Sequence, residues 1–152
     1  MKIENTFVLL KPDAVYRHLI GRIIRKFEDK GLKISALKMV HMDRPSAERL
    51  YAVHRDRHFF DPLMTFVTSG PCVGIIVTGP SAIEVVRRLV GDTHGKDALP
   101  GTVRGDFGLH QRMNLIHASD SAESFRHESG VIFGDQCPLE YTFPDEDYIH
   151  GN

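Results

Sequence analysis

The sequence has little of what marks several classes of protein. It contains two cysteines and no tryptophan in 152 residues, and neither Cys72 nor Cys137 lies in a C-x-x-C pattern, which argues against a disulfide framework and a zinc ribbon. A net charge of −1 argues against an acidic disordered chain and a nucleic-acid coat protein. No stretch approaches the roughly 18 apolar residues of a membrane span, and no signal region opens the chain. We therefore expect a cytoplasmic protein with reduced thiols that binds neither membranes nor nucleic acids.

The usual nucleotide-binding fingerprints are missing as well. Residues 91–97 (G-D-T-H-G-K-D) fall one residue short of P-loop spacing and lack Ser or Thr after the lysine, and no G-x-G-x-x-G follows a predicted strand. Bound phosphates would therefore be held mainly by side chains, because guanidinium and ammonium groups match phosphate oxygens. The candidates are Lys11, Arg87, Arg88, Lys96 and Arg104, each of which has a solvated surface position as its alternative.

Hydrophobic periodicity predicts alternating strands and helices. Strand-like runs occupy 6–10, 32–41, 72–78 and 115–118, and the second lacks clean alternation, which predicts burial on both faces or a bulge. Helical spacing covers 19–31, 47–54, 61–67 with Asp61 as N-cap, 82–90 and 121–133, whereas 91–113 has no period. This order predicts an α/β (strictly α+β) fold, a ferredoxin-like split βαβ sandwich with a four-stranded antiparallel sheet covered by helices. One domain is expected over 1–152, with a tail at 138–152.

His117 and Glu128 form the sharpest candidate pair. His117 lies near the end of the short predicted strand, just before Ser119-Asp120-Ser121, which open a helix whose N-terminus favours anions. Glu128 falls on or beside the inward stripe of that helix, and pairing with an imidazole would orient the ring and make its other nitrogen a better nucleophile. The alternatives are a structural histidine, serines that only cap the helix, and a carboxylate that reaches water or an arginine.

A rival constellation is His54, His58 and Asp61, which would act as zinc ligands of a hydrolase. The apolar stripe fades before His58 and no H-E-x-x-H pattern exists, so surface histidines are the better interpretation. Phe59 and Phe60 are ordinarily core residues, but one of them exposed beside a basic loop would be a stacking platform for a nucleobase.

Several motifs together resemble the nucleoside diphosphate kinase family, from Thr6 to Phe133. The segment N-L-I-H-A-S-D-S at 114–121 is similar to the family's active-site signature. It is joined by K-P-D-A at 11–14, F-F at 59–60, T-S-G-P at 68–71 and P-G-T-V-R-G-D-F at 100–107. Two departures are His94-Gly95 after Thr93, expected to loosen the long loop, and Gln111-Arg112-Met113 before Asn114.

The resemblance implies ping-pong transfer of a γ-phosphoryl group from a nucleoside triphosphate to a nucleoside diphosphate through a pros-phosphohistidine at His117. It also implies a homo-oligomer, with a hexamer favoured over a tetramer, and Mg²⁺ held mainly by the nucleotide phosphates with no direct protein ligand. Ser119 and Glu128 would support the nucleophile, with Lys11 also catalytic, and a stacked base would give broad base specificity. The nucleotide-binding residues would be Lys11 and Asn114 at the sugar, Tyr51, Arg87, Thr93 and Arg104 at the phosphates, and Phe59 at the base. The alternative is a nucleotide-binding module that kept the fold and lost catalysis.

Overall fold

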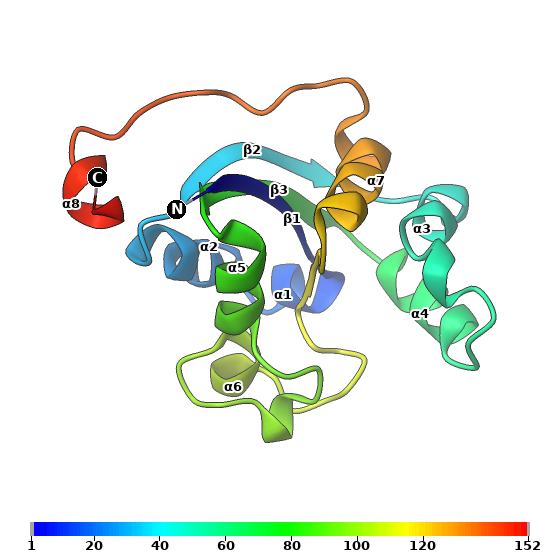
Figure 1. Cartoon of the computed structure of the whole chain (residues 1–152). Coiled ribbons are helices and arrows are strands. Elements are labelled where there is room, and N and C mark those ends of the chain that lie inside the picture. Colours follow the sequence, from blue (N-terminus) through cyan, green and yellow to red (C-terminus); the bar gives the residue numbers. More distant parts are fainter. Residues whose placement is uncertain (1, 152) are drawn as a thin grey trace.

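The computed structural model describes residues 2–151, which form one four-stranded sheet with helices on both faces (Figure 1). The strands lie in the order β2-β3-β1-β4, and every neighbouring pair is antiparallel. The predicted sheet is therefore confirmed. In chain order the elements are β1 (Ile3–Leu10), α1 (Pro12–Tyr16), α2 (Ile20–Asp29), β2 (Lys33–Val40), α3 (Arg44–Leu50), η1 (Ala52–His54), α4 (Phe60–Val67), β3 (Cys72–Pro80), α5 (Ala82–Val90), η2 (Gly95–Asp97), α6 (Val103–Phe107), β4 (Ile116–Ala118), α7 (Ala122–Phe133) and α8 (Glu146–His150).

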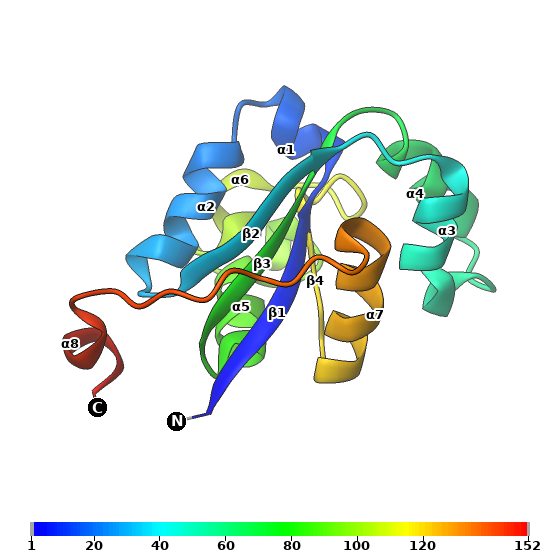
Figure 2. The ribbon, with the colours of Figure 1, turned by 90° about the horizontal axis from the view of Figure 1, so that it is seen from above.

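Two apolar clusters sandwich the sheet, one on each face. Val8 and Leu10 of β1 pack with α1, α2 and α5, whereas Phe7 and Leu9 of the same strand pack with α3, α4 and α7. Figures 1 and 2 show α2 and α5 on one side of the sheet and α7 on the other, with the α3–α4 hairpin beyond its end. Burial of β1 on both faces explains its continuous apolar run, because neither face meets water.

β2 is an edge strand with an irregular register. Its pairing with β3 shifts between Ile34 and Ala36, so of the two predicted alternatives, burial on both faces or a bulge, the structure has the bulge. Leu37 and Met39, beyond the bulge, are more than half exposed. An uncovered apolar edge of this kind favours pairing with another chain.

Several helix ends follow local chemistry. Gly31 and Gly91 adopt φ of 88° and 87° just after α2 and α5, a conformation that glycine reaches without steric cost. Ser121 caps α7 by accepting a hydrogen bond from the Ser124 N–H. The prediction that Asp61 caps α4 is wrong: α4 begins at Phe60, and the Asp61 carboxylate instead accepts a hydrogen bond from Arg44 at 2.6 Å.

The long segment 91–113 is more ordered than its lack of period predicted. It contains η2 and α6, and the Thr102 side chain caps α6 by accepting from the Gly105 N–H. Gly95 is buried, and a Cβ there would overlap the backbone of Gly108. Glycine at this departure from the family pattern therefore permits close packing of the loop.

The tail after Cys137 runs from the end of α7 across the front of the sheet in Figure 2 and ends in α8, which periodicity did not predict. The Leu139 N–H donates to the Ser35 carbonyl, and Lys33 pairs with Glu146 at 2.7 Å. Within residues 2–151 no helix combines the length and the apolar character needed to cross a membrane. The single-domain boundary over 1–152 stays a prediction.

Candidate active site

β4 and α7 bring His117 and Glu128 together. Ile116 and Ala118 are buried in the cluster with α1, α2 and α5, so the alternation of the strand turns His117 toward α7. Glu128 is 7% exposed, and its Oε2 accepts a hydrogen bond from Ser119 Oγ and lies 2.9 Å from His117 Nε2. A buried carboxylate needs such partners. Of the two positions that the sequence left open for Glu128, the structure thus has the inward-facing one beside an imidazole.

The two imidazole nitrogens of His117 are in different surroundings. Nε2 is buried and close enough to Glu128 for an ion pair, but the ring is not aligned for a linear hydrogen bond. Catalytic hydrogen bonds often tighten only when substrate binds, so this contact is expected to do so. Because the carboxylate takes Nε2, the nitrogen left for chemistry is Nδ1.

Tyr51, which directly follows α3, presents an unusual buried hydroxyl. Its ring packs edge-on against His117, with 5.3 Å between ring centroids, and the residue is 3% exposed. Its hydroxyl has no hydrogen-bond partner among residues 2–151. Burial, followed by the nearby Cys72 and Glu128, raises the pKa of Tyr51, so the phenol stays a neutral donor. A buried donor without a partner beside a nucleophile suits a ligand oxygen.

Lys11, Asn114 and Arg104 form a buried basic network. Lys11 Nζ donates to Asn114 Oδ1 at 2.8 Å, and Arg104 donates to the carbonyls of Gly91, Asn114 and Ile116. Three of the five guanidinium N–H groups are thereby used, which leaves two for a phosphate. Burial, and then Arg104, lowers the pKa of Lys11 to about 8, and burial, and then Arg87, lowers that of Arg104 to about 10. A bound anion would offset the cost of burying these two positive charges, those of Lys11 and Arg104.

Arg87 and Thr93 lie around this network. Arg87 Nη1 donates to the Ala118 carbonyl at 3.2 Å, immediately after His117, while the rest of its side chain is exposed. Thr93 is exposed, and its carbonyl accepts from Asn114 Nδ2 at 3.0 Å. Arg88, by contrast, pairs with Glu84 on the exposed face of α5, as its solvated alternative predicted.

Aromatic rings connect the nucleophile to the predicted base platform. Tyr51 stacks on His54, and the His54 ring lies 5.3 Å from the half-buried ring of Phe59, whereas Phe60 is a core residue at 7% exposure. Burial, and then His117, lowers the pKa of His54. Of the two phenylalanines, Phe59 is therefore the one available for stacking.

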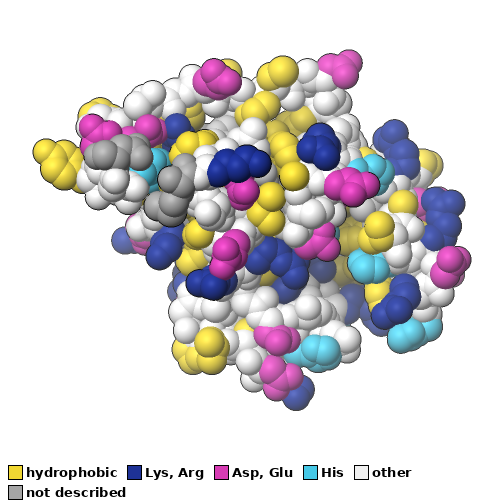
Figure 3. Space-filling view, in the orientation of Figure 1, with side chains coloured by type: hydrophobic (Ala, Val, Ile, Leu, Met, Phe, Trp, Pro, Cys, Tyr) yellow, Lys and Arg dark blue, Asp and Glu magenta, His cyan; other side chains and the backbone are white. Residues whose placement is uncertain are grey.

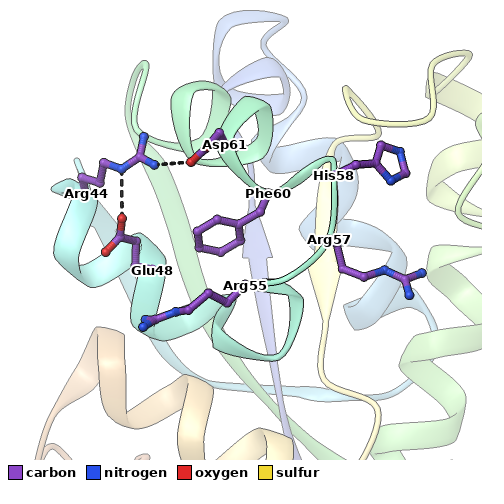
Figure 4. A pocket seen from close by; sticks show the side chains of 7 residues that line it. All are labelled: Arg44, Glu48, Arg55, Arg57, His58, Phe60 and Asp61. Carbon is purple, nitrogen blue, oxygen red and sulfur yellow. Dashed lines mark hydrogen bonds and ion pairs between the residues drawn. The ribbon is translucent and has the colours of Figure 1, made fainter.

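The rival zinc residues do not form a metal site. Across residues 2–151 no three His, Cys, Asp or Glu side chains gather as ligands, and Asp61 is engaged by Arg44. Arg and His side chains gather over the α3–α4 hairpin (Figure 3). They line a surface pocket of about 440 Å³ that does not include His117, and its Arg44 is bridged to Glu48 and Asp61 (Figure 4). The lining residues are Arg44, Glu48, Arg55, Arg57, His58, Phe60 and Asp61.

Comparison with known proteins identifies the family. The family model described as "Nucleoside diphosphate kinase" matches residues 4–137, which is most of the chain and all of the site. The chain belongs to the nucleoside diphosphate kinase family. Such enzymes are phosphotransferases that work through a phosphohistidine, as the resemblance of the motifs implied.

Individual relatives agree over nearly their full lengths. The chain is 53% identical over 143 residues to a nucleoside diphosphate kinase of Thermoplasma acidophilum, covering 94% of this chain and 97% of that protein. It is 56% identical over 135 residues to that of Hyperthermus butylicus, covering 89% and 95%. The solved structure of a halophilic nucleoside diphosphate kinase of Halobacterium salinarum in complex with CDP has a TM-score of 0.92 and 39% identity, covering 97% of this chain and 99% of that one.

Two features of the site escaped sequence reasoning. Asp13 reaches the backbone of Leu115 across 102 residues of sequence, and Leu115 has a positive φ of 77°. The K-P-D-A and N-L-I-H segments were noticed as motifs, but nothing in either one predicts that they touch. A buried leucine in a left-handed conformation has no sequence signal, because leucine rarely adopts it.

Proposed function

We propose that His117 Nδ1 is the nucleophile of this nucleoside diphosphate kinase. The observation that carries the proposal is the contact of His117 Nε2 with the buried Glu128 carboxylate, which is itself bound by Ser119. In the first half-reaction a bond forms between Nδ1 and the γ-phosphorus while the bond to the β,γ-bridging oxygen breaks, and the nucleoside diphosphate leaves with that electron pair. In the second, a diphosphate oxygen takes the phosphoryl group and returns Nδ1 to its free form. The Glu128 charge stabilises the positive charge that the imidazole carries during transfer.

The phosphate chain would lie against the basic network. Tyr51, Arg87, Thr93 and Arg104 would bind its oxygens, and the unpartnered Tyr51 hydroxyl supports this because a phosphate oxygen would satisfy it. Such contacts hold the γ-phosphorus in line with Nδ1, and phosphoryl transfer depends mainly on positioning and charge neutralisation.

Lys11 and Asn114 would bind the sugar hydroxyls as a pair, since Lys11 already donates to Asn114 Oδ1. Lys11 would also favour catalysis by bringing a cation to the site where negative charge moves from the bridging bond to the leaving oxygen.

The base would stack on Phe59. A ring face carries no hydrogen-bond code, which supports broad specificity for purine and pyrimidine nucleotides. The Halobacterium salinarum relative in complex with CDP is consistent with a pyrimidine in such a site.

Magnesium would reach the site with the nucleotide. The two carboxylates of the site, Glu128 and Asp13, accept hydrogen bonds from Ser119 and the Leu115 N–H, and the other side chains named above are cationic or neutral. Within the described part of the chain no cluster of three His, Cys, Asp or Glu side chains offers a protein-borne site, so this donor set fits an ion held by phosphate oxygens. When bound, the ion neutralises charge on the distal phosphates.

A homo-oligomer in the cytoplasm is the proposed setting. The exposed Leu37 and Met39 on the β2 edge support assembly, because a second copy would cover them. A hexamer stays favoured over a tetramer, as the family resemblance implies.

The test is to mix the protein with Mg²⁺ and a γ-labelled nucleoside triphosphate without an acceptor. Wild type should gain one acid-labile, alkali-stable label that any added nucleoside diphosphate removes. His117→Ala should gain none, and His41→Ala, which changes an exposed histidine on another segment, should label like wild type. Tight nucleotide binding by wild type without any label would overturn the proposal in favour of a binding module.

A further inference from the structure

The backbone that leads into His117 makes a strained turn. Leu115 is fully buried and has φ of 77°, and the Ile116 N–H donates to the Asn114 carbonyl two residues earlier at 2.9 Å. This is the hydrogen bond of a γ-turn with a positive central φ, which is rare for residues other than glycine. A strained turn persists only where its surroundings hold it.

The start of α1 holds both sides of the Leu115 peptide. The Lys11 N–H donates to the Leu115 carbonyl at 2.8 Å, and the Leu115 N–H donates to Asp13 Oδ2 at 3.0 Å. Arg104 donates to the carbonyls on either side, those of Asn114 and Ile116. Of these four contacts, only the hydrogen bond from the Leu115 N–H is accepted by an acidic side chain, that of Asp13 in α1.

Asp13 is more than an acidic residue at the start of a helix. α1 has five residues, so a helix dipole of this length is weak, whereas Oδ2 is aimed at an N–H 102 residues away in sequence. Its Oδ1 is buried and has no hydrogen-bond partner elsewhere in residues 2–151. Burial raises the pKa of Asp13, against the opposing charge of Lys11. Burying this carboxylate is unfavourable, and the hydrogen bond that it accepts from the Leu115 N–H is the interaction that such burial makes possible.

We infer that Asp13 is a positioning residue for the phosphoryl-transfer step: by holding the Leu115 N–H, it fixes the γ-turn that sets the position of His117 relative to Glu128 and the γ-phosphate. This inference rests on the proposed role of His117. Leu115 is two residues before His117, and Asp13 touches neither His117 nor Glu128 by any described hydrogen bond. Relaxation of the turn would therefore displace the nucleophile. Phe59, Tyr51 and Arg87 make no described hydrogen bond to residues 114–116, so their contacts with the nucleotide would stay in place.

The test compares Asp13→Ala with Asp13→Asn in rapid-quench labelling with a γ-labelled triphosphate and in nucleoside diphosphate binding by calorimetry. Asparagine keeps an acceptor oxygen for the Leu115 N–H and removes the charge, whereas alanine removes both. For Asp13→Ala we expect about 10- to 100-fold slower phosphohistidine formation with a Kd within about threefold of wild type, since a misplacement of about 1 Å costs rate on this scale. Asp13→Asn should recover most of the rate.

Two results would overturn the inference. Asp13→Ala that labels as fast as wild type would show that the turn needs no acceptor, and Asp13→Asn as slow as Asp13→Ala would assign the effect to charge. Folding of each variant is checked by thermal unfolding at the assay temperature, and if Asp13→Ala is unfolded, Asp13→Ser supplies a short side chain that does not reach Leu115. Absence of label on wild type would instead refute the role of His117, so the two failures are distinct.

Discussion

Replacing Glu128 by glutamine tests the support of the nucleophile without changing the size of the side chain. Glu128 is 7% exposed, and its Oε2 lies 2.9 Å from His117 Nε2. A carboxylate keeps the imidazole proton on Nε2 and leaves a lone pair on Nδ1, whereas an amide NH₂ that faces Nε2 donates to it and moves the proton to Nδ1. A protonated Nδ1 cannot attack phosphorus.

The size of the effect follows from the contact that is lost. A hydrogen bond to a charged group contributes about 1.5–3 kcal/mol, and each 1.36 kcal/mol is tenfold in rate, so Glu128→Gln should slow labelling of His117 about 10- to 150-fold. Rapid-quench measurement with a γ-labelled triphosphate gives the rate, and calorimetry should give an unchanged Kd for the nucleotide. Glu123→Gln, exposed on the same helix, is the matched control. Equal rates for wild type and Glu128→Gln would refute the reasoning.

Three further predictions concern the binding side of the site. Affinity for nucleoside diphosphates should fall as the pH rises through about 8, where Lys11 loses its charge in the folded protein. The free energy of unfolding should rise between about pH 8 and 10.5, because over this range Lys11 is protonated in the unfolded chain and not in the folded one. Calorimetry checks the binding, and in Lys11→Arg its pH dependence should disappear. Phe59→Ala should weaken binding of purine and pyrimidine diphosphates alike, by about 5- to 150-fold for a loss of about 1–3 kcal/mol of stacking; selective loss for one base class contradicts this. Tyr51→Phe should lower kcat/KM about tenfold. It should also raise the free energy of unfolding by about 1 kcal/mol in denaturant titration, because the buried hydroxyl has no partner in the described protein. A lower free energy of unfolding would show that the hydroxyl does have a partner.

The sequence predicted the features of the site that depend on local pattern. Glu128 was placed on the inner face of its helix from the spacing to Phe125, and the strand that carries His117 from a short apolar run. Both predictions were right because amphipathic periodicity fixes which face of an element is buried. The bulge in β2 was one of two alternatives that its pattern predicted, since its apolar residues change phase within one strand.

What the sequence did not predict depends on contacts between distant segments. α6 has five residues and is stabilised by the Thr102 cap and by hydrogen bonds from Arg104 to backbone carbonyls. It is too short to show a hydrophobic period, so the sequence pattern did not predict it. The tail helix α8 is likewise fixed by the Lys33–Glu146 pair and by Ile149 at the position where Gly31 lacks a side chain. Short elements of this kind gain their stability from tertiary partners rather than from propensity.

The costs in this fold are concentrated around His117. A phenol without a partner, a lysine with a pKa lowered to about 8, a buried carboxylate and a leucine with positive φ would each destabilise an ordinary core. The apolar clusters on the two faces of the sheet offset these costs, and a bound nucleotide would relieve those of the phenol and the lysine. Nucleotide binding would not relieve the backbone strain at Leu115. The hydrogen bonds with Asp13, Lys11 and Arg104 must therefore hold the strained turn in the free enzyme as well. The site is therefore preorganised on its nucleophile side and completed by its substrate on the phosphate side, which is why Glu128 and Asp13 variants should change the rate of transfer whereas Tyr51 and Phe59 variants should change binding.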